Sequence, residues 1–161
     1  MKILVFCHPR KFDSTHHLYN FIMQFVPQNK EAIVKTVDIY GTPDYKENAF
    51  TRTFAKKHNL EFDLMFLMDC GGDFMKSQPE YSGMYEENDR YIMKMNFINK
   101  IVHFTSNMLK PGGSMFLYKI SNDIKSIYAE KFLKRRWNVG EHTFAKTSTY
   151  YLKITRPTLR F

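Results

Sequence analysis

The sequence predicts one α/β domain with a mostly parallel sheet, helices on both faces and an antiparallel hairpin at its C-terminal end. The chain has 161 residues, which is a common size for a single domain. Its hydrophobic and aromatic fractions, 43% and 16%, supply a buried core and exclude a chain that is disordered throughout. Short continuous apolar runs alternate with segments of helical periodicity, which is typical of a parallel sheet whose strands are buried on both faces.

The first part of the chain predicts a strand, a helix and a second strand. The apolar run over 3–7 predicts a buried strand. Apolar side chains then recur at helical spacing over 18–25, and Ser14 or Thr15 is a candidate cap for this helix. The β-branched segment 32–40 predicts the second strand, so this region forms one βαβ unit.

The rest of the chain continues this alternation up to its C-terminal end. The expected elements are helices over 46–59 and 91–109, strands over 62–68 and 114–120, a long loop over 73–89, a helix from Ser121 or Asp123 to about 134, and a hairpin over 137–144 and 147–154. The sequence shows neither an internal repeat nor a low-complexity tract. We therefore expect residues 1–161 to form a single domain.

The positive charge is concentrated near the C-terminal end. The net charge is +8, and residues 119–161 hold ten Lys/Arg against three Asp/Glu, a net +7. This asymmetry predicts an anionic partner, RNA above all, although a solubilising face explains it as well. Lys134, Arg135, Arg136 and Trp137 combine cations with an aromatic ring, which suits phosphate contacts and base stacking. A solvated helix end is the alternative interpretation of this run.

The sequence shows neither a targeting signal nor a membrane span. Its first apolar run is too short for a signal peptide, and no run approaches the roughly 18 apolar residues of a membrane span. Cys7 and Cys70 form neither a metal-type pair nor a disulfide framework, so we expect thiols and a cytoplasmic protein. His16 and His17 fall in the first expected helix, where adjacent side chains diverge, so no metal site is expected.

Four segments follow the expected strands of the sheet, namely 8–14, 38–42, 69–73 and 119–122. In an open α/β sheet, ligands bind beyond the carboxyl ends of the strands. Cys7, His8, Asp38 and Asp69 are therefore candidate ligand-binding residues, and Lys119 follows the strand expected over 114–120. Asp38 is suited to accept hydrogen bonds from a ribose, but a turn residue beside a glycine is an equally good interpretation.

A turn in the second half carries a family resemblance. Residues 109–113, Leu-Lys-Pro-Gly-Gly, follow a helix and precede an apolar strand, and this arrangement resembles the turn before the fifth strand of class I S-adenosylmethionine-dependent methyltransferases. Residues 61–69 resemble their fourth strand, and the closing hairpin is similar to their sixth and seventh strands. The resemblance covers about residues 60–155 and implies a Rossmann-like fold with S-adenosylmethionine as the cofactor.

Within that family, the chain is most similar to the FtsJ-like ribose 2′-O-methyltransferases. The resemblance implies that Asp69 and Lys119 are the catalytic pair, with RNA as the substrate. Two other catalytic positions of that group are unmatched, because the group has a lysine before its first strand whereas this sequence starts at that strand, and because Thr149 stands where a glutamate is expected. The loop over 7–13 also contains no glycine, so its side chains crowd the place of the cofactor's methionine part.

Two further functions therefore stay open beside an RNA methyltransferase. One is a catalytically inactive, basic module that binds nucleic acid or a partner protein. The other rests on residues 3–9 followed by Ser14 and Thr15, which resemble the start of flavodoxin-like quinone reductases, where a helix N-terminus holds a flavin phosphate.

Overall fold

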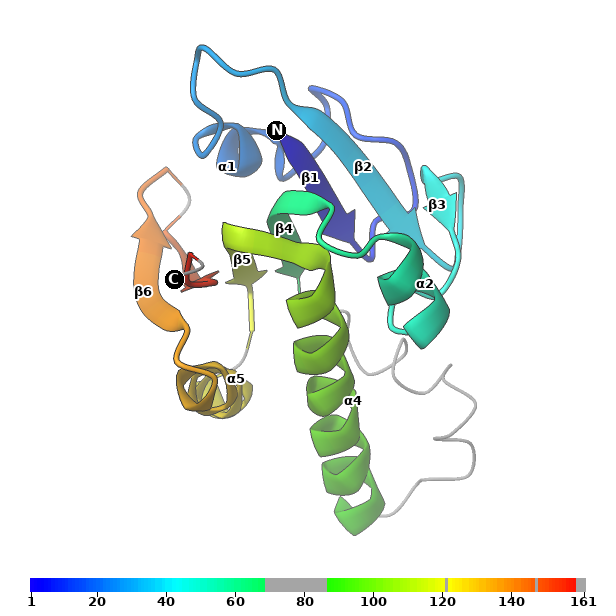
Figure 1. The fold of residues 1–161 in the computed structure, drawn as a ribbon, viewed down its shortest axis with the longest axis vertical. Coiled ribbons are helices and arrows are strands. Elements are labelled where there is room, and N and C mark those ends of the chain that lie inside the picture. Colours follow the sequence, from blue (N-terminus) through cyan, green and yellow to red (C-terminus); the bar gives the residue numbers. More distant parts are fainter. Residues whose placement is uncertain (69–86, 121, 147, 159–161) are drawn as a thin grey trace.

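A computed structural model describes residues 1–68, 87–120, 122–146 and 148–158 of the chain (Figure 1). Asp69 and most of the loop expected over 73–89 lie outside the described residues. The elements are β1 (Lys2–Phe6), α1 (Tyr19–Met23), β2 (Ile33–Asp38), β3 (Tyr45–Lys46), α2 (Arg52–Lys57), β4 (Phe62–Met68), α4 (Glu87–Met108), β5 (Leu109–Tyr118), α5 (Asn122–Lys134), β6 (Asn138–Phe144) and β7 (Thr149–Thr155).

These strands form one seven-stranded sheet in the order β3-β2-β1-β4-β5-β7-β6. The strands β1 to β5 are parallel to their neighbours, whereas β7 runs antiparallel to both β5 and β6. The prediction of a mostly parallel sheet with a C-terminal antiparallel hairpin is confirmed.

The strand side chains alternate between two hydrophobic cores. On one face, Leu4 and Phe6 of β1 pack under α2, α4 and α5. On the other face, Ile3 and Val5 pack with Phe21 of α1 in a cluster rich in aromatic rings. Helices therefore cover both faces of the sheet, as expected from apolar runs whose side chains point alternately to either side.

The segment expected to stop the long helix belongs instead to a strand. Residues 110–113 continue β5, and the register of β5 against β4 shifts between Phe62 and Leu64. Gly112 adopts a left-handed conformation within this stretch. The Arg156 guanidinium fixes the junction by donating to the carbonyl oxygens of Ser106 and Leu109, at 2.7 and 2.8 Å.

Two of the expected helices are shorter in the structure. The segment 46–59 begins in β3 and becomes helical only over Arg52–Lys57. The first helix spans Tyr19–Met23 and has no side-chain cap, so neither Ser14 nor Thr15 caps it. None of the helices in the described ranges is both long and apolar enough to cross a bilayer.

Candidate functional site

The carboxyl ends of the parallel strands lie on one edge of the sheet, here called the carboxyl edge. Cys7 and His8 follow β1, Asp38 ends β2, and Lys119 follows β5. Asp69 follows β4 in the sequence but lies outside the described residues, so the Asp69–Lys119 pair stays a prediction. The Lys119 side chain is exposed, and its Nζ lies 5.6 Å from the Tyr118 ring centroid.

The loops after β1 and β2 close against each other at this edge. The Thr42 N–H donates to the Pro9 carbonyl oxygen at 2.7 Å, and Arg10 bridges to Thr42 in parallel register. Gly41 has a φ of 75°, and a Cβ at this position would lie 2.1 Å from the Pro9 oxygen. Only glycine permits this approach of the two loops.

Little space remains between the ends of β1 and β2. The cavity there measures about 10 Å³, and the Phe6 and Phe50 rings stack beside it with centroids 5.4 Å apart. Binding sites for molecules of cofactor size occupy roughly 300–1,000 Å³. The Asp38 carboxylate accepts from the Tyr40 N–H at 2.9 Å, so it stabilises its own turn. The cavity that these residues line is too small for the methionine part of S-adenosylmethionine.

Cys7 lines the same small cavity, and its state in the structure differs from the one expected from the sequence. Its φ is 57°, and its sulfur is disulfide-bonded. The prediction of a free thiol at this position is therefore wrong.

Three histidines lie side by side at the end of β1, and we call them the histidine cluster. His8, His16 and His17 have ring centroids 3.6 Å (His8–His16), 4.9 Å (His16–His17) and 5.6 Å (His8–His17) apart. Residues 14–18 form turns rather than a helix, so the expectation that His16 and His17 diverge is wrong. The sequence places His16 and His17 next to each other, but their approach to His8 depends on this non-helical backbone.

The surroundings of the histidine cluster favour the neutral form of each imidazole. Burial lowers the pKa of His16 to about 4, and the neighbouring His8 and His17 add to this effect. Burial also lowers the pKa of His8 and of His17, and Lys119 is among the charges that lower the pKa of His17. Lys119 therefore acts electrostatically on the cluster from the end of β5.

The basic run after α5 presents charge without an aromatic ring. Lys134, Arg135 and Arg136 are exposed, and Lys134 pairs with Glu130 at 3.0 Å. Trp137 is only 9% exposed and packs against Phe132 in the core. Its ring is therefore not accessible for the base stacking that the sequence suggested.

The structure also forms a basic groove between α2 and α4 that the sequence did not predict. This α2–α4 groove has a volume of about 590 Å³ and is lined by Arg52, Ala55, Lys56, Asn59, His103, Phe104 and Asn107. A second hollow of about 480 Å³ shares its two cations and adds Thr53 and Lys57. Arg52 and Lys56 lie four residues apart in the sequence, but their pairing with the end of α4 is a tertiary feature.

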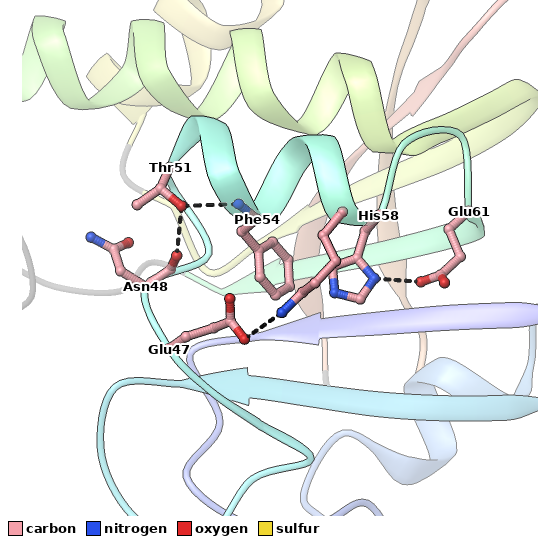
Figure 2. Close-up of polar contacts among 7 residues, drawn as sticks. Glu47, Asn48, Thr51, Phe54, His58 and Glu61 are labelled. Atoms are coloured by element: carbon pink, nitrogen blue, oxygen red, sulfur yellow. Dashed lines mark hydrogen bonds and ion pairs between the residues drawn. The ribbon is translucent and has the colours of Figure 1, made fainter.

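Both ends of α2 are fixed by side-chain contacts (Figure 2). Thr51 caps the helix, since its Oγ1 accepts from the Phe54 N–H at 3.2 Å and donates to the Asn48 carbonyl oxygen. At the other end, the buried His58 donates from Nδ1 to the Glu61 carboxylate at 2.8 Å. The cations of the groove are therefore carried on a short helix that is held in place from both sides.

Comparisons with known proteins identify the fold. No family model matches the sequence, and no curated protein matches it. An O-methyltransferase family protein from Burkholderia thailandensis matches 99% of this chain and 52% of its own, with a TM-score of 0.53 and 10% identity. The CurJ carbon methyltransferase matches 98% of this chain and 48% of its own, with a TM-score of 0.55 and 9% identity.

The chain spans about half the length of both structures. At this identity, the likeness shows the fold and not the activity. The expected Rossmann-like methyltransferase fold is confirmed.

Proposed function

We propose that this chain is a domain of methyltransferase fold that binds RNA and does not transfer a methyl group from S-adenosylmethionine. The observation that carries the proposal is the α2–α4 groove, because two of its cations form no ion pair within the described part of the chain. Arg52 and Lys56 make no ion pair with any described residue, although the neighbouring Lys57 pairs with Glu47 at 2.8 Å. Unpaired cations on a fixed helix suit phosphate groups.

The other side chains of the groove suit the remaining parts of a nucleotide. Asn59 and Asn107 are exposed, and their amides both donate and accept hydrogen bonds. Phe104 is partly buried and contributes a ring against which a base can stack. Charge, amide groups and an aromatic ring in one groove are the combination that proteins use for single-stranded nucleic acids.

The carboxyl edge supports the non-catalytic part of the proposal. A cofactor ribose at the end of β2 would have to share the Asp38 carboxylate, since one of its oxygens already accepts from the Tyr40 N–H. The methionine part needs room at the end of β1, where the described residues line a cavity of about 10 Å³. Methyl transfer at Asp69 and Lys119, implied by the family resemblance, is the competing function.

The RNA part is tested by fluorescence anisotropy with a labelled single strand of about 12 nucleotides. Arg52→Ala/Lys56→Ala should weaken binding at least tenfold and reduce the slope of log K against log salt by about 1.4, because two phosphate contacts are lost. Lys134→Ala/Arg135→Ala is the matched control, since it removes the same charge. The control should retain more of the affinity.

Three outcomes decide the RNA part. A greater loss of RNA affinity in the control variant would assign the RNA contact to the basic run after α5 rather than to the groove. Equal losses would indicate binding by net charge alone. No binding of the unmodified chain at low salt would overturn RNA binding altogether.

The catalytic part is tested separately by calorimetry. S-Adenosylmethionine and S-adenosylhomocysteine should give no binding heat up to millimolar concentration. Micromolar binding that Asp38→Ala abolishes would overturn the non-catalytic assignment and restore a methyltransferase. The anisotropy result would stand unchanged in either case.

A further inference from the structure

The histidine cluster is not used by the proposed RNA site. One ring nitrogen from each of His8, His16 and His17 lies within 4.8 Å of the other two. His8 and His16 are 7% and 3% exposed, whereas His17 is exposed. The cluster therefore combines two buried imidazoles with a third that solvent reaches.

The hydrogen bond of His8 leaves one of its nitrogens free to bind a ligand. The Nδ1 atom lies 3.2 Å from the Arg10 carbonyl oxygen, and a carbonyl oxygen only accepts. Nδ1 therefore carries the proton and Nε2 keeps its lone pair. A histidine whose second nitrogen donates to a backbone carbonyl is held as metal-ligating histidines commonly are.

His16 has a buried nitrogen without a partner. Its Nδ1 accepts from the Leu18 N–H at 3.0 Å, whereas its Nε2 is buried and makes no hydrogen bond to any described residue. A buried polar atom without a partner costs free energy, and a bound cation would remove that cost. In the metal-free state, the proton of neutral His16 resides on Nε2.

We propose that His8, His16 and His17 form a binding site for one divalent transition-metal cation such as Zn²⁺. Three imidazole nitrogens are a donor set that suits zinc, copper and nickel. With three protein ligands, the remaining coordination position is left to water, and exposed His17 gives access from solvent. The lowered pKa of each histidine keeps the ligands neutral near pH 7, so the cation does not compete with protons.

Binding requires two local adjustments. Zinc–nitrogen bonds of about 2.05 Å place tetrahedral ligands roughly 3.3 Å apart, so the nitrogens must move closer by up to about 1.5 Å. The turn that carries His17 supplies this movement. If His16 binds through Nε2, its proton shifts to Nδ1, and the Leu18 N–H loses its acceptor.

Charged groups around the cluster limit the affinity. Arg10 and Lys119 are the nearby cations, and Asp13 and Asp38 are the nearby carboxylates. The carboxylates only partly offset the cations, so we expect micromolar rather than nanomolar binding. The inference does not depend on RNA binding.

The test is calorimetric titration of the full chain with zinc chloride after removal of metal by a chelator. We expect one ion per chain, with His17→Ala weakening the affinity at least tenfold. His103→Ala is the matched control, since His103 is also exposed but lies on α4. The zinc affinity of this variant should equal that of the unmodified chain. Because His17 is exposed, its substitution should leave the fold intact.

An independent readout is the backbone amide of Leu18, followed by NMR during the titration. Its resonance should move as the first equivalent of zinc binds, since the hydrogen bond to His16 is broken. Absence of binding would overturn the proposal. Equal affinities of His17→Ala and His103→Ala, or an unmoved Leu18 amide on binding, would also overturn it.

Discussion

The carboxyl edge and the α2–α4 groove differ in the space that they offer to a partner, and the fold does not determine this difference. At the carboxyl edge, where open α/β sheets bind ligands, the loops after β1 and β2 leave about 10 Å³ between them. The groove lies in the helical layer and offers about 590 Å³ lined by two cations that no described residue pairs. Side chains, rather than topology, decide which of the two regions has room for a partner.

The difference shows how one fold supports different functions. The sheet order brings the ends of five parallel strands to one edge, but Gly41 and the bond from the Thr42 N–H to the Pro9 oxygen close the loops after β1 and β2 against each other. The helical layer needs no such contact between loops, because α2 is short and is held at its two ends by side-chain contacts. The fold fixes where strands end, while individual loop residues determine whether that place is open.

The largest expected effect tests the closure of the carboxyl edge. Gly41→Ala should lower the free energy of unfolding by about 3 kcal/mol, through its left-handed backbone and the overlap with the Pro9 oxygen. Gly112→Ala is the control, since its φ is 79° but its nearest atom, Thr158 Cγ2, lies at 3.1 Å. In urea unfolding, the free energy of unfolding of the control should fall by about 1 kcal/mol. Equal losses would mean that the loop contact contributes nothing.

Acid should destabilise the carboxyl edge through His16. The pKa of His16 is about 4 in the folded chain and near 6.5 when unfolded, so the unfolded chain binds more protons between these values. The contribution is complete above pH 6.5 and is lost as the pH falls towards 4. In metal-free buffer, we expect unfolding free energies to drop by about 2–3 kcal/mol over this window.

His16→Asn provides the matched control for the acid effect. Its side-chain oxygen can still accept from the Leu18 N–H, but it does not titrate. The variant should show a flatter dependence of stability on pH. The assignment of acid sensitivity to His16 fails if the variant and the unmodified chain give parallel curves.

A smaller effect is expected where α2 begins. Thr51→Ala removes the cap of the helix and should cost about 1 kcal/mol of stability. RNA affinity should fall with it, because the first turn carries Arg52. Thr53→Ala, on the same helix, should change stability by less than about 0.5 kcal/mol. Unchanged RNA affinity in Thr51→Ala would argue that the position of α2 does not affect RNA binding.

The smallest effect is expected in the basic run after α5. Lys134→Ala removes an ion pair with Glu130 that lies entirely on the surface. Its melting temperature should be indistinguishable from that of the unmodified chain in differential scanning calorimetry. A clear drop would give this run a structural role that its exposure does not suggest.

Most of the sheet could be predicted from the sequence. The strand expected over 62–68 coincides with β4, and the closing hairpin is present as β6 and β7. Continuous apolar runs bounded by turn residues determine these elements locally. The beginning of β5 could not be predicted, since Pro111 and the two following glycines indicate a turn, whereas pairing with Phe62 and the Arg156 contacts extend the strand.

The candidate sites depend more on tertiary contacts. The sequence allows Asp38 to be a turn residue or a ribose acceptor, and its hydrogen bond with the Tyr40 N–H gives it the first of these roles in the folded chain. The histidine cluster could not be predicted, because Ser14 or Thr15 as the cap of the helix expected over 18–25 places His16 inside that helix. The groove joins residues from α2 with others from the end of α4, so neither segment predicts it alone.

The central position of β1 has a consequence for the time course of folding. Ile3 pairs with Val34 on one side and with Leu64 on the other, so the strand acquires its last neighbour only after about sixty residues of chain have been made. Contacts between such distant residues close large loops and slow the search for the native state. Until then, the hydrogen-bonding edge of the first strand that later pairs with β4 is exposed to other chains. We therefore expect refolding yields to fall steeply as protein concentration rises.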